Sequence, residues 1–341
     1  TSEINPLFSD SVYIDRLSRI PAIMEMPYND IIRKFIDMYA GRLRNQVSFM
    51  LSACNFYMPI FEEALDAYGL PLELRYLPII ESALNPSAVS RAGASGLWQF
   101  MIGTGKIYGL ESNSLVDERR DPIKATWAAA RYLKEMYDIY GDWNLVIAAY
   151  NCGPGTINKA IRRANGETDY WKIYNYLPKE TRGYVPAFIA ANYVMTYYCD
   201  HNICPMETNI PTSTDTVQVN KNLHFEQIAD LCNVPLDQIK SLNPQYKKQM
   251  IPGDSKPYTL RLPIDAISTF IDKQDTIYAH RADELFRNRK TVAIKEITPS
   301  TRKTTTAVAG KGKLTYYTIK SGDTLSTIAG KYGVTIKDIQ R

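Results

Sequence analysis

Residues 74–104, LRYLPIIESALNPSAVSRAGASGLWQFMIGT, decide the fold, because they place one carboxylate at the end of an apolar helical segment. In this stretch Glu81 directly follows two isoleucines. Loss of hydration beside apolar side chains disfavours the charged form and raises the pKa of a carboxyl group, which suits a general acid near neutral pH. Because Pro86 disfavours helical backbone at Asn85, the sequence predicts that Glu81 lies in the last turn of a helix and faces a cleft.

The segment that follows is small and glycine-rich, with the sequence SRAGASG at residues 90–96. A loop of this kind lets the backbone approach a ligand closely. Trp98 and Gln99 come next, an apolar plate beside an amide that both donates and accepts hydrogen bonds, and this pairing suits a sugar. The structural alternatives are that Glu81 caps a helix and that Trp98 packs beneath the loop.

The composition is that of a folded protein of two or three domains. The chain has 341 residues, of which 45% are apolar and 22% are charged, which is ordinary for a soluble protein. Its net charge is +4, but residues 276–313 alone carry nine Lys or Arg against three Asp or Glu. The remainder is about neutral, and no basic stripe interleaves with aromatic residues, which argues against nucleic-acid binding.

No run in the sequence approaches the roughly 20 apolar residues that cross a bilayer. The first ten residues, TSEINPLFSD, lack the basic and apolar regions of a signal peptide. Removal of an earlier leader is left open by this pattern.

Five cysteines and three histidines do not match the spacing of a metal site. Cys199, His201 and Cys204 lie close together, but a zinc site needs a fourth ligand or an open catalytic position, and no matching pair lies elsewhere. We expect no metal and no cofactor. Two alternatives stay open for Cys199 and Cys204, a disulfide outside the cytosol or free thiols in packed helices.

Helical periodicity runs through the first 205 or so residues. Apolar residues recur three and four positions apart between residues 14 and 69. Asp121 and Pro122 are typical of an N-cap and a first helical residue. Residues 143–150, WNLVIAAY, are apolar almost all round, which predicts a buried central helix that delivers the turn after it to the cleft.

After residue 205 the pattern changes. TVQV at 216–219 and YTLRL at 258–262 alternate like strands and flank two short helical patterns, which predicts a small βααβ unit. A shift of 100 residues lays its apolar positions onto those of residues 325–339, so the unit is repeated. The Lys-, Arg- and Thr-rich stretch between the copies has too few large apolar residues to pack and is predicted to be a tether.

Four separated segments point to one cleft: Glu81-Ser82, Gly96 to Phe100 (GLWQF), Ala149 to Asn151 with Gly153, and Tyr184-Val185. In this order and spacing the chain resembles the goose-lysozyme-like lytic transglycosylases, most closely the membrane-bound type D group with LysM modules after the catalytic domain. The resemblance covers nearly the whole chain. It is strongest from Leu70 to Ala190, in the motifs GLPLELRYLPIIESALNP, GASGLWQFM, DERRDP, AAYNCGPG and LPKETRGYVP.

The resemblance implies a mainly α, lysozyme-like catalytic domain followed by small βααβ LysM-type modules. It also implies cleavage of the β-1,4 bond between N-acetylmuramic acid and N-acetylglucosamine in peptidoglycan, with formation of 1,6-anhydro-N-acetylmuramic acid ends. Glu81 matches the catalytic glutamate of the family, which acts as general acid and then as base.

The same resemblance implies roles for the residues around this glutamate. Ser82 and Gln99 would hold the muramic acid side of the substrate. Tyr150 and Asn151 would contact sugar and orient the acid, and Tyr184 would hydrogen-bond toward the catalytic carboxylate. Trp98 is expected to bind substrate by stacking on a sugar face or, alternatively, to pack under the loop.

Residues 314–341 resemble a LysM domain, which binds N-acetylglucosamine chains, and they stop before its closing strand. The earlier copy lacks the Ser321 to Thr324 turn of that domain, so we expect its fold more than its sugar binding. The predicted organisation is a catalytic domain with an N-terminal helical extension at 1–205, a degenerate LysM-like module at 206–275, a basic Thr-rich linker at 276–313 and a C-terminally truncated LysM module at 314–341. We expect residues 206–341 to act by tethering, with little effect on the chemical step.

These predictions place a monomer in the periplasm or cell envelope, with peptidoglycan strands as its partner. Membrane association would come through a removed N-terminal leader or a lipid anchor, and an outer-membrane location is left open. Two other functions remain as alternatives, a hydrolytic goose-type lysozyme and a non-catalytic peptidoglycan-binding protein. Hydrolysis usually needs a second carboxylate, and the nearest acidic residues, Asp117, Glu118 and Asp121, are typical of a charged loop and a helix cap.

Overall fold

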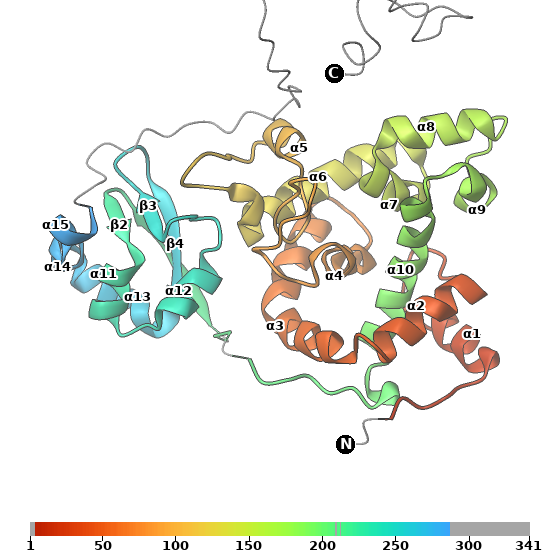
Figure 1. Ribbon diagram of the computed structural model, residues 1–341, viewed down its shortest axis with the longest axis horizontal. Helices are drawn as coiled ribbons and strands as arrows, with labels where there is room; N and C mark the ends of the chain where they lie inside the picture. Colours follow the sequence, from red (N-terminus) through yellow and green to blue (C-terminus); the bar gives the residue numbers. More distant parts are fainter. Residues whose placement is uncertain (1–3, 209, 212, 287–341) are drawn as a thin grey trace, which may run out of the picture. The chain divides into compact units, whose positions relative to one another are not determined.

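The computed structural model describes residues 4–208, 210–211 and 213–286 (Figure 1). The first two hundred residues are helical, as predicted, apart from isolated β-bridges in loops. The helices are α1 (Asp10–Ser18), α2 (Asp30–Ala40), α3 (Arg44–Ala67), η1 (Leu72–Tyr76), α4 (Leu77–Ser82), α5 (Ile102–Ile107), η2 (Glu118–Arg120), α6 (Pro122–Tyr140), α7 (Trp143–Cys152), α8 (Pro154–Arg163), α9 (Tyr170–Ile173), η3 (Tyr174–Tyr176), α10 (Lys179–Thr196) and η4 (Cys199–His201).

Helix α7 lies at the centre of this helical region, as predicted. Its residues from Leu145 to Ala149 are all fully buried, because α6, α8 and α10 pack around it. The helix begins at an N-cap, where Asp142 Oδ1 accepts a hydrogen bond of 2.8 Å from the Leu145 amide. Helix α10 lies next to both α2 and α7 (Figure 1), so residues at the end of α7 meet residues on α10.

Helix α6 follows the local rules that its sequence indicates. Asp121 Oδ1 accepts hydrogen bonds of 3.0 Å from the amides of Ile123 and Lys124, and Pro122 is the first helical residue. Gly141 ends the helix with a left-handed φ of 61°. The predicted start of the helix at Asp121 and Pro122 is confirmed, and the helix runs to Tyr140.

The glutamate-bearing segment is helical but short. A 3-10 turn, η1, leads into α4, and the chain then leaves the helix at Ala83 and Leu84, which have φ values of 51° and 58°. Two left-handed residues in succession turn the backbone sharply away from the helix axis. The helix therefore ends before Asn85, and the prediction that Glu81 lies in its last turn is confirmed.

Residues 213–286 form a second, mixed region with its own apolar core. Strand β1 (Thr214–Val219) pairs antiparallel with β4 (Tyr258–Pro263), with Val217 opposite Leu260. Helices α11 (Phe225–Cys232) and α12 (Leu236–Leu242) lie between them in the sequence, which confirms the βααβ order. A second antiparallel pair, β2 (Asn222–His224) with β3 (Met250–Pro252), was not predicted. Three-residue strands are too short to show alternation.

Three further helices follow β4, namely α13 (Ile264–Asp272), α14 (Gln274–Ala279) and α15 (Ala282–Leu285). Ile277 is fully buried, and Gln227 Nε2 donates to the carbonyls of Tyr278 and His280 at 3.1 and 2.7 Å. The linker boundary set at residue 276 therefore falls inside α14, and residues 276–286 pack on the module. The rest of the linker and the second copy at 314–341 lie outside the described residues.

The three residues considered for a metal site or a disulfide, Cys199, His201 and Cys204, form neither in the structure. His201 is buried, and its ring nitrogens lie 2.7 Å from Asn5 Oδ1 and 3.2 Å from Tyr193 OH. Burial, aided by the charge of Arg16, lowers the pKa of His201 to about 4. Cys199 and Cys204 are exposed free thiols. His201 therefore has a structural role in the packing of α10 and η4.

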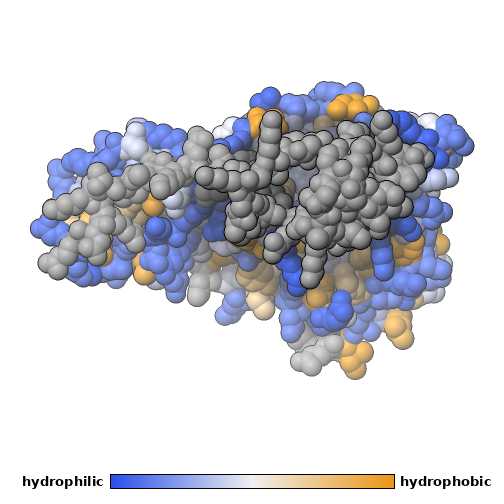
Figure 2. All heavy atoms as spheres, turned by 45° about the horizontal axis from the view of Figure 1, so that its top comes forward, coloured by the Kyte–Doolittle hydropathy of each residue, from blue (hydrophilic) through white to orange (hydrophobic). Residues whose placement is uncertain are grey.

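The described surface is mainly polar on the face shown in Figure 2, where hydrophilic side chains cover most of the coloured area and apolar ones form small separate groups. None of the described helices combines the length and the apolar character that a membrane span needs.

Candidate active site

Glu81 opens into a cavity of about 410 Å³. One wall comes from the end of α4 and from the loop that carries Gln99. Further lining comes from α2 and α3, through Tyr39, Gln46 and Met50. The cavity thus combines apolar surface with one carboxyl group and the amides of Gln46 and Gln99, which is a suitable lining for a sugar ring.

The electrostatic surroundings of Glu81 favour its protonated form. Burial raises the pKa of its carboxyl group to about 7, the hydrogen bond from Tyr184 works in the opposite direction, and the like charge of Glu180 raises it further. Among the ion pairs of the described residues, none involves Glu81. A group with this pKa exchanges its proton readily near neutral pH, as acid–base catalysis requires.

Tyr184, which lies on α10, holds the side chain of Glu81 by a hydrogen bond. Its hydroxyl donates to Glu81 Oε1, and its side chain is 8% exposed. Burial, with the neighbouring Glu81 charge, raises the pKa of Tyr184 well above its ordinary value, so it stays a donor. The contact joins residues 103 positions apart and exists because α10 packs against α4.

The loop from Gly96 to Phe100 is held by hydrogen bonds from Ser82, Tyr150 and its own Gln99. Ser82 Oγ lies 2.9 Å from the Leu97 carbonyl and 3.0 Å from the Pro78 carbonyl, so its single proton serves one of the two. Tyr150 OH donates to the Trp98 carbonyl at 2.7 Å. Gln99 has a left-handed φ of 49°, and its Nε2 donates to the Gly96 carbonyl at 2.8 Å. The loop is thereby fixed to both α4 and α7.

The structure brings some predicted residues to the cavity and places others behind it. Ser82 and Gln99 line it. Tyr150 supports the loop from α7, and Asn151 Oδ1 accepts a hydrogen bond of 2.9 Å from Thr181 Oγ1 on α10. Neither Tyr150 nor Asn151 is part of the cavity wall.

Trp98 does not fit the expectation that it stacks on a sugar. Its side chain is fully buried, its Nε1 donates to Thr126 Oγ1 at 2.9 Å, and its ring meets Phe61 edge-on with centroids 5.3 Å apart. An indole with no exposed face has no surface to offer a substrate. Trp98 instead packs beneath the loop, as the alternative interpretation predicted.

Sequence reasoning missed three residues near Glu81. Tyr39 and Gln46 reach the cavity from α2 and the start of α3. No local pattern distinguishes buried Tyr39 from other apolar-face residues of an amphipathic helix, or exposed Gln46 from other surface residues. Glu180 influences Glu81 electrostatically and could have been found, because it lies four residues before Tyr184 on the same helix and therefore shares its face.

The acidic residues weighed as alternative catalysts have structural partners instead. Asp117 receives two hydrogen bonds from Arg119, at 2.9 and 2.8 Å. Glu118 pairs with Lys124, and Asp121 caps α6. The interpretation of this segment as a charged loop and helix cap is confirmed.

The chain is similar to known proteins over most of its length. Residues 58–173 match the model of the transglycosylase SLT domain, residues 213–279 match the LysM-like domain of lytic transglycosylase MltD, and residues 317–341 match the LysM domain. The membrane-bound lytic murein transglycosylase D of Escherichia coli strain K12 is 32% identical over 324 residues, which cover 93% of this chain and 66% of that protein.

Two further relatives resemble a smaller part of the chain. The soluble lytic murein transglycosylase of Escherichia coli K12 is 33% identical over 124 residues, which cover 35% of this chain and 19% of that protein. The crystal structure of a 70 kDa soluble lytic transglycosylase from Escherichia coli aligns at 29% identity with a TM-score of 0.37, over 42% of this chain and 24% of the other. The combination and order of the matched domains, with the identity to the type D enzyme, show that this chain belongs to the lytic transglycosylases that carry an SLT domain and LysM-type domains.

Proposed function

We propose that this chain is a peptidoglycan lytic transglycosylase that cleaves the β-1,4 bond between N-acetylmuramic acid and N-acetylglucosamine. The observation that carries the proposal is the state of Glu81, a carboxyl group with a pKa of about 7 that is held by Tyr184 and opens into a cavity. A group held in this way can both give and take a proton at neutral pH. The matched SLT and LysM-type domains support peptidoglycan as the substrate.

In the proposed reaction, protonated Glu81 gives its proton to the glycosidic oxygen while the bond from that oxygen to the anomeric carbon of muramic acid breaks. The Glu81 carboxylate then takes the proton of the 6-hydroxyl group of the same sugar, and the 6-oxygen bonds to the anomeric carbon. No water is consumed, and Glu81 returns to its protonated state. Because the attack is intramolecular, it has a large effective concentration and needs no protein group to position a nucleophile.

The surrounding residues are proposed to have supporting roles in this reaction. Ser82 and Gln99 would contact the muramic acid side, since both line the cavity. Tyr184 would orient the Glu81 carboxyl group. Tyr150 and Asn151 would act on the substrate through the loop and α10, to which they are bonded.

Hydrolysis by the same fold is the second candidate, and Glu180 is the observation in its favour. A hydrolytic glycosidase usually uses a second carboxylate beside the scissile bond, and Glu180 is close enough to affect the pKa of Glu81. It is exposed, however, and lies one turn before Tyr184. The intramolecular route needs only Glu81, so we favour it.

Mass spectrometry of digests of purified sacculi tests this proposal. We expect muropeptides with 1,6-anhydro-N-acetylmuramic acid ends, one water lighter than lysozyme products. Glu180→Gln should leave that product unchanged. Predominantly reducing, borohydride-sensitive ends would refute the transglycosylase reaction and favour hydrolysis, while binding to sacculi with no release of muropeptides would favour a non-catalytic wall-binding protein.

We place the protein in the cell envelope, bound to peptidoglycan, as a monomer that is attached to the outer membrane through a leader or lipid anchor. The name of the membrane-bound relative supports the envelope location. Fractionation of cells that express the complete protein tests the anchor, and light scattering of the purified protein tests the monomer.

A further inference from the structure

The LysM-like module is joined to the catalytic domain by backbone pairing. Val116 forms an antiparallel bridge with Tyr246. On either side of it, the Asp117 amide donates to the Gln245 carbonyl at 2.9 Å and the Lys247 amide donates to the Leu115 carbonyl at 2.8 Å. Leu115 and Val116 are almost fully buried and belong to the apolar core of the module. The loop before η2 therefore pairs with the module at one isolated bridge and contributes Leu115 and Val116 to its core.

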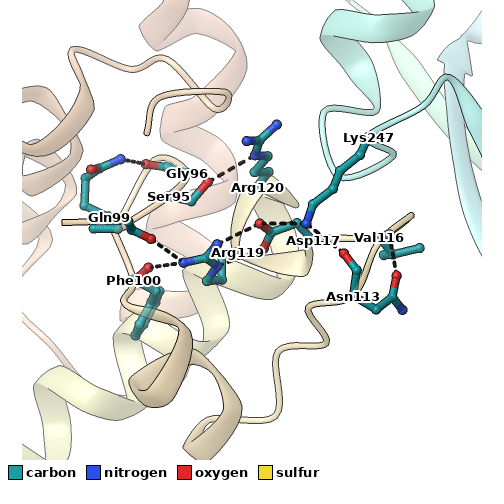
Figure 3. Close-up of polar contacts among 12 residues, drawn as sticks. Ser95, Gly96, Gln99, Phe100, Asn113, Val116, Asp117, Arg119, Arg120 and Lys247 are labelled. Atoms are coloured by element: carbon teal, nitrogen blue, oxygen red, sulfur yellow. Dashed lines mark hydrogen bonds and ion pairs between the residues drawn. The ribbon is translucent and has the colours of Figure 1, made fainter. Parts of the chain in front are cut away.

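A buried charge network lies directly beside this bridge (Figure 3). The carboxylate of Asp117 is held at both oxygens by Arg119, and the side chains of the two residues are only 2% and 6% exposed. The ammonium group of Lys247, from the module, lies 3.8 Å from Asp117 Oδ2 and donates to the Asn113 carbonyl at 2.7 Å. The module thus supplies one of the two cations around Asp117.

Arg119 continues this network to the back of the active-site loop. Its Nη1 donates to the carbonyls of Gly93 and Phe100, at 2.8 and 3.0 Å. Its own carbonyl oxygen packs so closely on Gly96 that a Cβ there would lie 1.8 Å from it. Arg120 Nε donates to Ser95 Oγ at 3.1 Å. The loop from Gly93 to Phe100 therefore rests on Arg119 and Arg120 along its length (Figure 3).

The front of the same loop forms part of the catalytic cavity. Gln99 lines it, and the Leu97 carbonyl lies within hydrogen-bond distance of Ser82, the residue after Glu81. A continuous set of contacts accordingly runs from Lys247 through Asp117 and Arg119 to the loop, and from the loop to the end of α4.

We infer that the LysM-like module positions the active-site loop, and that Lys247 is a positioning residue for the reaction. This inference rests on the proposed function. It replaces, for residues 213–286, the expectation of a tethered module with no effect on the chemical step. The physical reason is that a loop shifted by about 1 Å can slow an enzyme by about a hundredfold, and a buried Asp117–Arg119 pair keeps its geometry best when its remaining acceptor sites are filled.

The test compares two lysines of the module in the full chain. Lys247→Met keeps the apolar stem and removes the cation beside Asp117. The control is Lys256→Met, because Lys256 also joins the module to the catalytic domain, through Glu111 at 2.6 Å, but is half-exposed and does not contact Asp117 or Arg119. Two quantities are measured, kcat and KM on a short soluble glycan of alternating N-acetylglucosamine and N-acetylmuramic acid, and deuterium uptake of residues 93–100.

For Lys247→Met we expect kcat to fall about tenfold, with KM changed less than about twofold, and uptake at residues 93–100 to rise. Lys247→Arg should restore both, and Lys256→Met should leave both near wild type. Unchanged kcat and uptake in Lys247→Met would overturn the inference, and so would equal effects of the two methionine variants. Absence of product from the wild type would instead refute the proposed function, and the uptake comparison would still decide whether the module positions the loop.

Discussion

The end of α4 and the loop before η2 each carry a carboxylate in packed surroundings, half-buried at the cavity for Glu81 and almost fully buried for Asp117, and the two differ in their neighbours. Glu81 has a tyrosine hydroxyl as its partner and another carboxylate nearby, and burial raises its pKa to about 7. Asp117 has a bidentate arginine and a lysine. A carboxyl group that loses hydration without a cationic partner is ready for proton transfer. A carboxyl group that loses hydration but is paired with cations has a structural role instead.

Replacement of Glu81 should have the largest effect. Glu81→Gln keeps the size and a hydrogen-bond partner for Tyr184 but cannot transfer a proton. Because a positioned acid contributes about 10² to 10⁴ in rate and Glu81 serves two proton transfers in the proposed reaction, release of muropeptides from sacculi should fall by at least that factor. The melting temperature should stay near that of wild type. Activity within a few-fold of wild type would remove Glu81 from the mechanism.

Replacement of Asp117 should mainly lower the stability of the fold. Asp117→Ala leaves Arg119 buried without its partner, so the free energy of unfolding should fall by about 3–5 kcal/mol. Asp138→Ala is the matched control, because it breaks an exposed pair with Lys134 on α6 and should cost less than about 1 kcal/mol. Denaturant unfolding measures both variants. Similar losses in the two would show that the Asp117 network does not differ from a surface ion pair.

His201 extends the comparison to a buried base. Its pKa falls from 6.5 to about 4 on folding, so the unfolded chain binds an extra proton between these values. Stability should therefore decrease as the pH falls from about 6.5 to 4, by at most about 3 kcal/mol, and this contribution should be fully present above pH 6.5. Unfolding followed across this range checks the effect. His201→Gln should flatten the dependence, and an unchanged slope in that variant would assign it to other groups.

The pH dependence of catalysis should show the smallest effects. Since the proposed reaction starts from protonated Glu81, kcat/KM should fall as the pH rises through about 7. Tyr184→Phe removes the hydrogen bond that lowers the pKa of Glu81, so the fall should move to higher pH. Glu180→Gln removes a like charge, so it should move to lower pH, in each case by up to about one unit. Shifts in the same direction would contradict this account of the site.

Several features of the fold around these carboxylates could be predicted from the sequence alone. The cap of α6, the place of Glu81 in the last turn of α4 and the burial of α7 depend on residues within a few positions of one another. Local hydrogen bonding, steric exclusion before proline and helical periodicity decide them. The order of the four motifs predicted the family, and the comparisons with known proteins confirm this prediction.

Only the tertiary structure decided which residues meet. Glu81 and Tyr184 are separated by 103 positions, the second wall of the cavity comes from α2 and α3, and the bridge of Val116 to Tyr246 joins the two regions. Trp98 follows a ligand-like loop in the sequence but is enclosed by the core. Such contacts depend on how distant helices pack as a whole, because burial and the filling of space are properties of the folded chain and no local pattern encodes them.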